Sequence, residues 1–224
     1  MSAEVRCFSR WMTVTFPQPY RCVSWAVING GIAATNTVAW LFLEIDEIEE
    51  CDDIRQWFRD RLRADALEHA VGLLTSRRLH RYVESGAGTG CHVVATVGMS
   101  NALSAGDPPA GPPHSGTVNI LCIVSRPLTP EAELEALALA AEARAAAVRD
   151  ARIPSIVSGI DATGTGTDCI VIAHPGGDRA EPYCGKHTEL GHLIGKHVRE
   201  AVRKGVEEWL REFRPNERER AIRK

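Results

Sequence analysis

Residues 22–43 carry no charged side chain, and a run of this length could cross a bilayer as a helix. The middle of the run argues against that fold. Asn29, Gly30 and Gly31 stand where a spanning helix would meet hydrocarbon, and paired glycines interrupt helices. We therefore expect sheet strands joined by a small turn, and no insertion into a membrane.

Short β-rich segments continue on both sides of this run. Pro17 and Pro19 favour a rigid turn between the first two of them. The segment at 117–125 is so rich in Val, Ile and Leu that we expect it to be buried on both faces. The expected strands are 13–16, 21–28, 38–45, 92–98, 117–125 and 168–173.

Apolar residues at helical spacing predict helices after Asp52 and Asp53, at 129–150 and at 188–213. Thr129 and Pro130 form a start signal, as N-cap and first helical residue. Residues 77–84 predict a small polar helix, and the Gly- and Pro-rich segment 104–116 predicts a surface loop.

These elements do not alternate as a doubly wound parallel sheet requires. The pattern predicts the α+β class, with a mixed β-sheet packed with helices; a layered α/β sandwich is one such arrangement. We expect a single domain over residues 1–215 and a charged C-terminal tail over 216–224.

The charge balance and the cysteines restrict the function classes. A net charge of −3 gives no basic field for nucleic acid. The seven cysteines include no Cys-x-x-Cys pair, which favours a reducing compartment and disfavours structural zinc. The first residues lack the order of a signal peptide. We expect a cytoplasmic protein with no nucleic-acid or membrane partner and no protein-bound metal.

The densest polar feature is the Thr-Gly-Thr-Gly-Thr-Asp sequence at 163–168, directly before a strand. Glycines allow a ligand to approach the backbone, and Asp168 could orient a water, an amide or an imidazole. A tight turn whose threonines bond their own backbone is the alternative.

A second polar feature, Tyr-Cys-Gly-Lys-His-Thr-Glu-Leu-Gly at 183–191, opens the last helix. Backbone N–H groups at a helix start face negative charge, and the dipole there favours a neutral His187. A helix merely capped by Thr188 is the alternative. His187, His192 and His197 recur every five residues, so they do not share a face and do not predict a zinc site.

Asparagines follow or begin several strands, at Asn29, Asn101 and Asn119. A carboxamide side chain both donates and accepts hydrogen bonds, so these residues together would suit a ligand edged with amides. Each could also be an ordinary turn residue.

In this order the motifs resemble the adenosylcobinamide amidohydrolase family over residues 24–202. The matching segments are 24–31 (Ser-x-x-x-x-Asn-Gly-Gly), 71–75, 96–102, 116–120, 163–168 and 183–191. Three features depart from the family pattern: Arg144 stands where Lys is usual, Cys184 where a small residue is usual, and the 104–116 loop is long.

The resemblance implies hydrolysis of adenosylcobinamide to adenosylcobyric acid and aminopropanol, in salvage of incomplete corrinoids. It implies a cobalt-containing corrinoid as substrate and no dissociable cofactor. A homo-oligomer is left open.

The predicted mechanism has Asp168 or His187 activating water as a general base, with Glu189 or Lys186 in electrostatic support. The backbone at 164–167 would bind the oxyanion. Covalent attack by Thr165, Thr167 or Cys184 is the rival mechanism. The candidate catalytic residues are Asp168, His187, Glu189, Thr165 and Thr167. The candidate substrate-binding residues are Asn29, Gly30, Gly31, Asn101, Asn119, Gly164, Gly166 and Lys186.

Two other functions fit the same residues. A corrinoid carrier would need the Asn-rich cleft without acid–base groups, and stoichiometric binding without product would select it. An amidase for another small amide would have a cleft too narrow for a corrin ring.

Overall fold

The computed structural model describes residues 3–44, 47, 51–109, 111 and 115–213. Its strands and helices follow one another as β1 (Glu4–Phe8), β2 (Trp11–Ser24), β3 (Gly31–Phe42), α2 (Ile54–Ala64), β4 (Val71–Thr75), η1 (Leu79–Arg81), β5 (Val83–Ser85), β6 (Cys91–Val97), β7 (Ala102–Leu103), β8 (Val118–Val124), α3 (Pro130–Asp150), β9 (Gly164–Thr165), β10 (Cys169–Pro175) and α4 (Glu189–Phe213). The predicted 216–224 tail lies outside the described residues.

An eight-stranded mixed sheet runs in the order β4-β3-β2-β10-β8-β6-β5, and β1 pairs with β2. The β3–β4 and β8–β10 pairs are parallel, whereas β2 is antiparallel to both β3 and β10. A separate two-stranded sheet joins β7 to β9. The predicted α+β class with a mixed sheet is confirmed.

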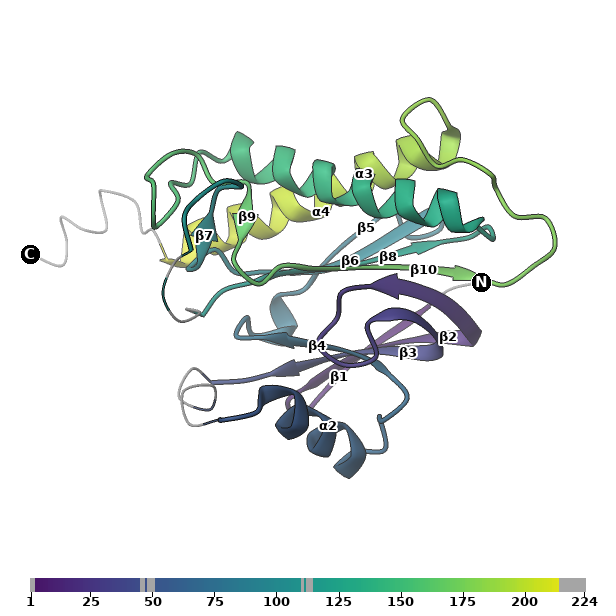
Figure 1. Cartoon of the computed structure of the whole chain (residues 1–224), viewed down its shortest axis with the longest axis horizontal. Helices are drawn as coiled ribbons and strands as arrows, with labels where there is room; N and C mark the ends of the chain where they lie inside the picture. The colour runs from purple at the N-terminus through teal and green to yellow at the C-terminus, as the bar shows by residue number, and fades with distance from the viewer. Residues whose placement is uncertain (1–2, 45–46, 48–50, 110, 112–114, 214–224) are drawn as a thin grey trace, which may run out of the picture.

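The elements stack in layers (Figure 1), with α3 and α4 on one side and α2 on the other. One apolar core lies between α3–α4 and the β6-β8-β10 part of the sheet. A second core contains residues of β2, β3 and β4 together with β8 and β10, so the two parts of the sheet pack on each other. A third lies under α2. The fold is therefore a helix–sheet–sheet–helix sandwich.

β10 shows how the sequence produces these layers. Ile170 and Ile172 belong to the core under the helices, while Cys169, Val171 and Ala173 belong to the core between the sheet parts. Alternate residues of a strand point to opposite faces, and both faces of this strand are buried. β8 is buried along its whole length in the same way, as its composition predicts.

The rigid turn predicted at Pro17 and Pro19 is wrong, and the strands predicted at 21–28 and 38–45 end earlier, at Ser24 and Phe42. β2 continues through both prolines, and its pairing with β3 shifts register between Thr15 and Tyr20. Neither proline can donate to a ladder, so the strand tolerates them at this irregularity. The first part of β2 then pairs with β1 and the last part with β10.

The three longer helices form as predicted. α2 begins at Ile54, and the Asp53 side chain caps it by accepting from Arg55 N and Gln56 N. α3 begins at Pro130, and the Thr129 side chain caps it by accepting from Ala132 N. α4 covers Glu189–Phe213. The small polar helix predicted at 77–84 is wrong: only the single turn η1 forms there, and Val83 starts strand β5 beside β6.

The charge-free run at 22–43 forms the end of β2, a turn and β3. No helix in the described part of the chain combines the length and the apolar character that crossing a bilayer requires.

Candidate active site

Asp168 is the organising residue of the Thr-Gly-Thr-Gly-Thr-Asp turn, named here the 163–168 turn. Its carboxylate accepts from the guanidinium of Arg144, from the Thr165 hydroxyl, and from the backbone N–H groups of Thr165 and Val118, the last two at 3.0 Å. The side chain is 6% exposed. A carboxylate has about four acceptor positions, so hydrogen bonding to the ionised form is nearly complete. Such a carboxylate holds its neighbours in place.

Gly164 makes room for the ion pair between Arg144 and Asp168. A Cβ atom there would lie 2.2 Å from Arg144 Nη1 and 2.3 Å from Asp168 Oδ2. Arg144 lies on α3, and its side chain extends to Asp168 and is 17% exposed. Arg144, the residue that departs from the family pattern, is thus part of the site.

Of the three asparagines predicted to bind substrate, two lie at the 163–168 turn and one lies in a loop. Asn101 and Asn119 are 3% and 2% exposed and lie beside the 163–168 turn. The Asn101 carbonyl accepts from Gly166 N at 3.2 Å, and Asn119 Nδ2 donates to Leu74 O at 2.7 Å. A Cβ at Gly166 would lie 2.9 Å from Asn101 Nδ2. The backbone of Asn101 therefore ties the segment after β6 to the 163–168 turn, and the side-chain amide of Asn119 ties β8 to β4.

Asn29 instead ties down a loop. Its Nδ2 donates to Glu68 O and Ala70 O at 3.0 and 2.8 Å. Its φ of 53° lies in the left-handed region, where Asn is tolerated. Gly30 has no room for a side chain because a Cβ would lie 2.4 Å from Ala26 O, and Gly31 has a φ of 82°.

A cavity of 240 Å³ opens at this end of the sheet. Thr167, Asp168 and Asn119 line it together with Thr117, whose hydroxyl donates to Thr167 O at 2.9 Å. Its apolar wall is formed by Trp25, Val27, Leu43, Ile54 and Leu73. Among the described residues the Thr167 hydroxyl contacts only Gly116 O, at 3.5 Å, so it can turn to a ligand.

Trp25 stands at the cavity as a fixed aromatic surface. It is 47% exposed, yet its indole Nε1 donates to the carbonyl of Asp168. An exposed ring held by its polar edge presents an apolar face with little conformational freedom left to lose.

The Lys186, His187 and Glu189 cluster does not meet Asp168. Lys186 Nζ pairs with Glu142 at 2.5 Å, and Glu189 with Arg126 at 2.8 Å. Glu142 and Arg144 are two residues apart on α3, which turns their side chains by about 200° around the helix axis. Lys186 and Asp168 therefore contact opposite sides of α3. His187 is exposed.

Cys184 is fully buried, and burial raises the pKa of its thiol to about 12. A nucleophilic cysteine needs a thiolate, so this geometry opposes attack by Cys184. The N–H groups of Thr165 and Gly166, predicted to bind an oxyanion, donate instead to Asp168 and to the Asn101 carbonyl. Within the described residues, no three His, Cys, Asp or Glu side chains gather as metal ligands.

Sequence reasoning missed two cavity residues, Trp25 and Ser76. Ser76 accepts from Gly116 N at 3.2 Å and thereby joins the end of β4 to the start of β8. Trp25 lies inside the 24–31 motif but between its specified residues. Neither residue belongs to a chemical cluster in the sequence, so only the fold reveals them.

Comparison with known proteins gives a consistent result. A family model described as adenosylcobinamide amidohydrolase matches residues 1–213. An adenosylcobinamide amidohydrolase of Halobacterium salinarum is 37% identical over 125 residues, 51% of this chain and 49% of that protein. An uncharacterised protein of Methanocaldococcus jannaschii is 39% identical over 88 residues, 39% of this chain and 34% of that protein. The matches thus span half or less of these relatives.

Proposed function

The chain belongs to the adenosylcobinamide amidohydrolase family, and from that membership we propose that it hydrolyses the amide joining the corrin ring side chain of adenosylcobinamide to aminopropanol. The family is one of hydrolases that act on carbon–nitrogen amide bonds. In the proposed reaction a water oxygen bonds to the amide carbon and the carbon–nitrogen bond breaks. The nitrogen leaves as protonated aminopropanol, and adenosylcobyric acid remains.

One observation carries the proposal: five of the six family-like motifs meet at one place. The 240 Å³ cavity takes lining residues from the 24–31, 71–75, 116–120 and 163–168 motifs. Asn101 brings the 96–102 motif against Gly166. Motifs that are distant in the chain thus contribute to one cavity, which combines an apolar wall with a few convergent polar groups as ligand sites do.

The shape of the cavity also suits the proposed substrate. Trp25 and its apolar neighbours offer one face to a flat macrocycle, while Asn119 and the threonines offer hydrogen bonds to amides. A corrin ring is far larger than 240 Å³, so the ring would lie at the mouth and the side-chain amide inside.

Within the cavity we propose that Thr167 touches the reacting amide. A hydroxyl that donates to the developing oxyanion stabilises the transition state. Asp168 is then a positioning residue: it holds the Thr165 hydroxyl and the whole turn. Because the proton of Thr165 is committed to Asp168, Thr165 Oγ1 would act as an acceptor toward an amide N–H.

The roles of His187, Glu189 and Lys186 stay predictions. None of the three lines the cavity, and Lys186 pairs with α3 on the side opposite Arg144. His187→Ala therefore tests the cluster apart from the cavity residues. Loss of turnover with retained corrinoid binding would support catalysis by His187. Unchanged turnover would restrict the chemistry to the cavity.

The decisive experiment is incubation with adenosylcobinamide in ¹⁸O-labelled water, followed by mass spectrometry. Release of aminopropanol and one labelled oxygen in the acid product are expected. Tight binding of intact adenosylcobinamide would instead select the carrier function. Neither binding nor release would mean that this chain acts on another amide.

We further propose that residues 1–215 act as one domain, in the cytoplasm and without a dissociable cofactor. Seven cysteines without a disulfide support a reducing setting. A chain ending at residue 215 should retain the full rate of hydrolysis, and full activity after exhaustive dialysis against a chelator would support the absence of a dissociable metal.

A further inference from the structure

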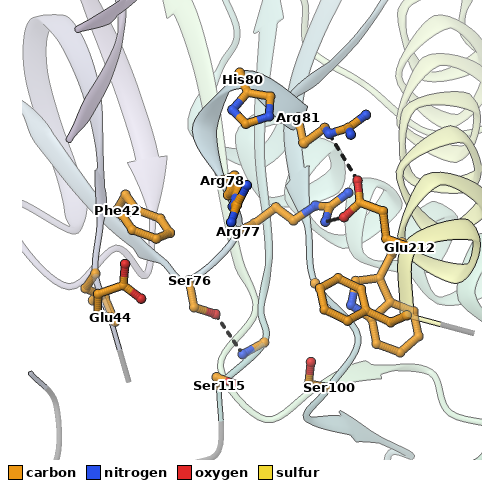
Figure 2. A pocket seen from close by; sticks show the side chains of 15 residues that line it. Phe42, Glu44, Ser76, Arg77, Arg78, His80, Arg81, Ser100, Ser115 and Glu212 are labelled. Atoms are coloured by element: carbon orange, nitrogen blue, oxygen red, sulfur yellow. Dashed lines mark hydrogen bonds and ion pairs between the residues drawn. The ribbon is translucent and has the colours of Figure 1, made fainter. Parts of the chain in front are cut away.

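A second pocket, of 440 Å³, lies beside the cavity (Figure 2). Leu43, Ser76 and Gly116 line both, so the two spaces adjoin across the ends of β3, β4 and β8. None of the predicted catalytic or substrate-binding residues lines this pocket.

Three arginines stand on one wall, in the segment that follows β4. Arg77 and Arg81 pair with Glu212 of α4, Arg81 at 3.0 Å. Arg78 is exposed, lines the pocket, and forms no ion pair with a described residue. Glu44 on the opposite wall is the other carboxylate of the lining. The lining is therefore basic, with three guanidinium groups against two carboxylates.

The unpaired donors of Arg77 are the strongest indication that this pocket binds an anion. It is 6% exposed, and Glu212 occupies only its Nη1. Its Nε and Nη2 have no hydrogen-bond partner in the described part of the chain. A buried donor without an acceptor is costly. Nε and Nη2 share one edge of the guanidinium plane, and this edge is the fork that binds two oxygens of one carboxylate or phosphate.

Hydroxyl groups complete the polar surface. Ser76, Ser100 and Ser115 line the pocket below the arginines in the view of Figure 2, and Ser76 also lines the cavity. Ser76 accepts from Gly116 N, so its own hydroxyl proton is free to donate. Guanidinium groups together with hydroxyl donors are the usual chemistry of oxyanion binding.

We propose that this pocket is an oxyanion-binding site for a phosphate-ester or carboxylate group of the ligand. Arg78 makes the first contact at the surface, and Arg77 holds the anion through its free edge. The proposal rests on the proposed function in one respect only: a ligand whose amide lies in the cavity would reach the pocket with a group a few bonds away.

Isothermal titration of the full chain with inorganic phosphate, and separately with acetate, tests the site without any corrinoid. We expect saturable binding in the wild type and at least tenfold weaker binding in Arg78→Ala. The control Arg179→Ala removes an exposed arginine far from this pocket and should bind as the wild type does. Glu212→Gln removes the internal competitor of Arg77 and Arg81, so it should bind several-fold more tightly, which mere loss of structure could not produce.

The two anions identify the source of the oxyanion. Phosphate bound at least tenfold more tightly than acetate assigns a phosphate ester, and equal affinities assign a carboxylate such as the acid that hydrolysis leaves. No saturable binding of either anion, or equal affinity in all four proteins, overturns the site. Because hydrolysis is not measured, that result would leave the proposed amidohydrolase function untouched.

Discussion

Arg144 on α3 forms a nearly buried ion pair with Asp168, which precedes β10. The pair joins the helical layer to the 163–168 turn, and the other oxygen of Asp168 fixes Val118 at the start of β8. One carboxylate thus ties α3 and the 163–168 turn to the start of β8, beside the cavity.

Removing the guanidinium should be costly. Arg144→Met leaves the Asp168 carboxylate buried with fewer donors, and we expect a loss of about 3 kcal/mol in the free energy of unfolding. Arg144→Lys retains the charge but loses the planar arrangement of guanidinium donors, so about 1 kcal/mol should be lost. Urea denaturation of the three proteins measures both values. Equal stability of Arg144→Met and the wild type would contradict the role given to this pair.

Gly164 should tolerate no side chain, because the ion pair fills the space beside it. We expect Gly164→Ala to cost about 2 kcal/mol by overpacking and to lower turnover by misplacing Asp168. Gly176→Ala is the matched control, since a Cβ there meets nothing within 4 Å. Thermal unfolding of both variants gives the comparison; a similar small change in each would show that the turn can relax around a methyl group.

The elements were largely predictable because burial leaves a local pattern. The β8 run and the Thr129–Pro130 start signal each determine an element from adjacent residues alone. The turn predicted at Pro17 and Pro19 is wrong because a strand can contain prolines where its pairing shifts register. The register shift depends on the partner strand β3, which the local sequence around the prolines does not show. The glycines and hydroxyls of the 163–168 turn predicted a polar site from adjacent residues. In the structure the Asp168 carboxylate accepts hydrogen bonds that fix Arg144, Thr165 and Val118 in place.

The relation between the two polar motifs was beyond the sequence. The motifs that contain Asp168 and His187 are close in the chain, and both are rich in acid–base groups, which suggested a joint site. The intervening α3 separates them, since Glu142 and Arg144 face opposite sides of that helix. Only the packing of α3 against α4 and the sheet decides this.

Stability should depend on pH through His197. The ring is 5% exposed and lies against Ser85, with Nδ1 3.0 Å from the hydroxyl. Burial, together with nearby Lys196, lowers the pKa of His197 below its usual 6.5. The unfolded chain then binds a proton first as pH falls, so stability is full above about pH 6.5 and declines below it. In His197→Gln the midpoint of thermal unfolding should fall less between pH 7 and pH 5 than it does in the wild type. An equal fall in both proteins would exclude His197 as the cause.

Thr167 should matter for rate more than for binding. Thr167→Val removes the hydroxyl at nearly constant volume, and loss of one oxyanion donor costs about 100-fold or more in kcat. Thr167→Ser keeps the hydroxyl and should stay within roughly tenfold of the wild type. Thr163→Ala is the control from the same turn, because its hydroxyl accepts from Ala105 N and does not line the cavity. Equal kcat values for Val and Ser at position 167 would remove Thr167 from the chemistry.

Trp25 should govern affinity and leave the chemical step unchanged. Its ring is 47% exposed beside the cavity, and the bond from Nε1 to the Asp168 carbonyl fixes its orientation. Stacking of a flat macrocycle on such a face is worth about 1 kcal/mol beyond area burial. Trp25→Leu should therefore raise KM for adenosylcobinamide roughly tenfold while kcat changes less than about twofold. Phe8→Leu, at an equally exposed aromatic residue on β1, should change neither. The difference in tryptophan fluorescence quenching by the corrinoid between the wild type and Trp25→Leu gives an independent readout, because the chain has four other tryptophans. A fall in kcat with unchanged KM would show that the macrocycle does not lie on this ring.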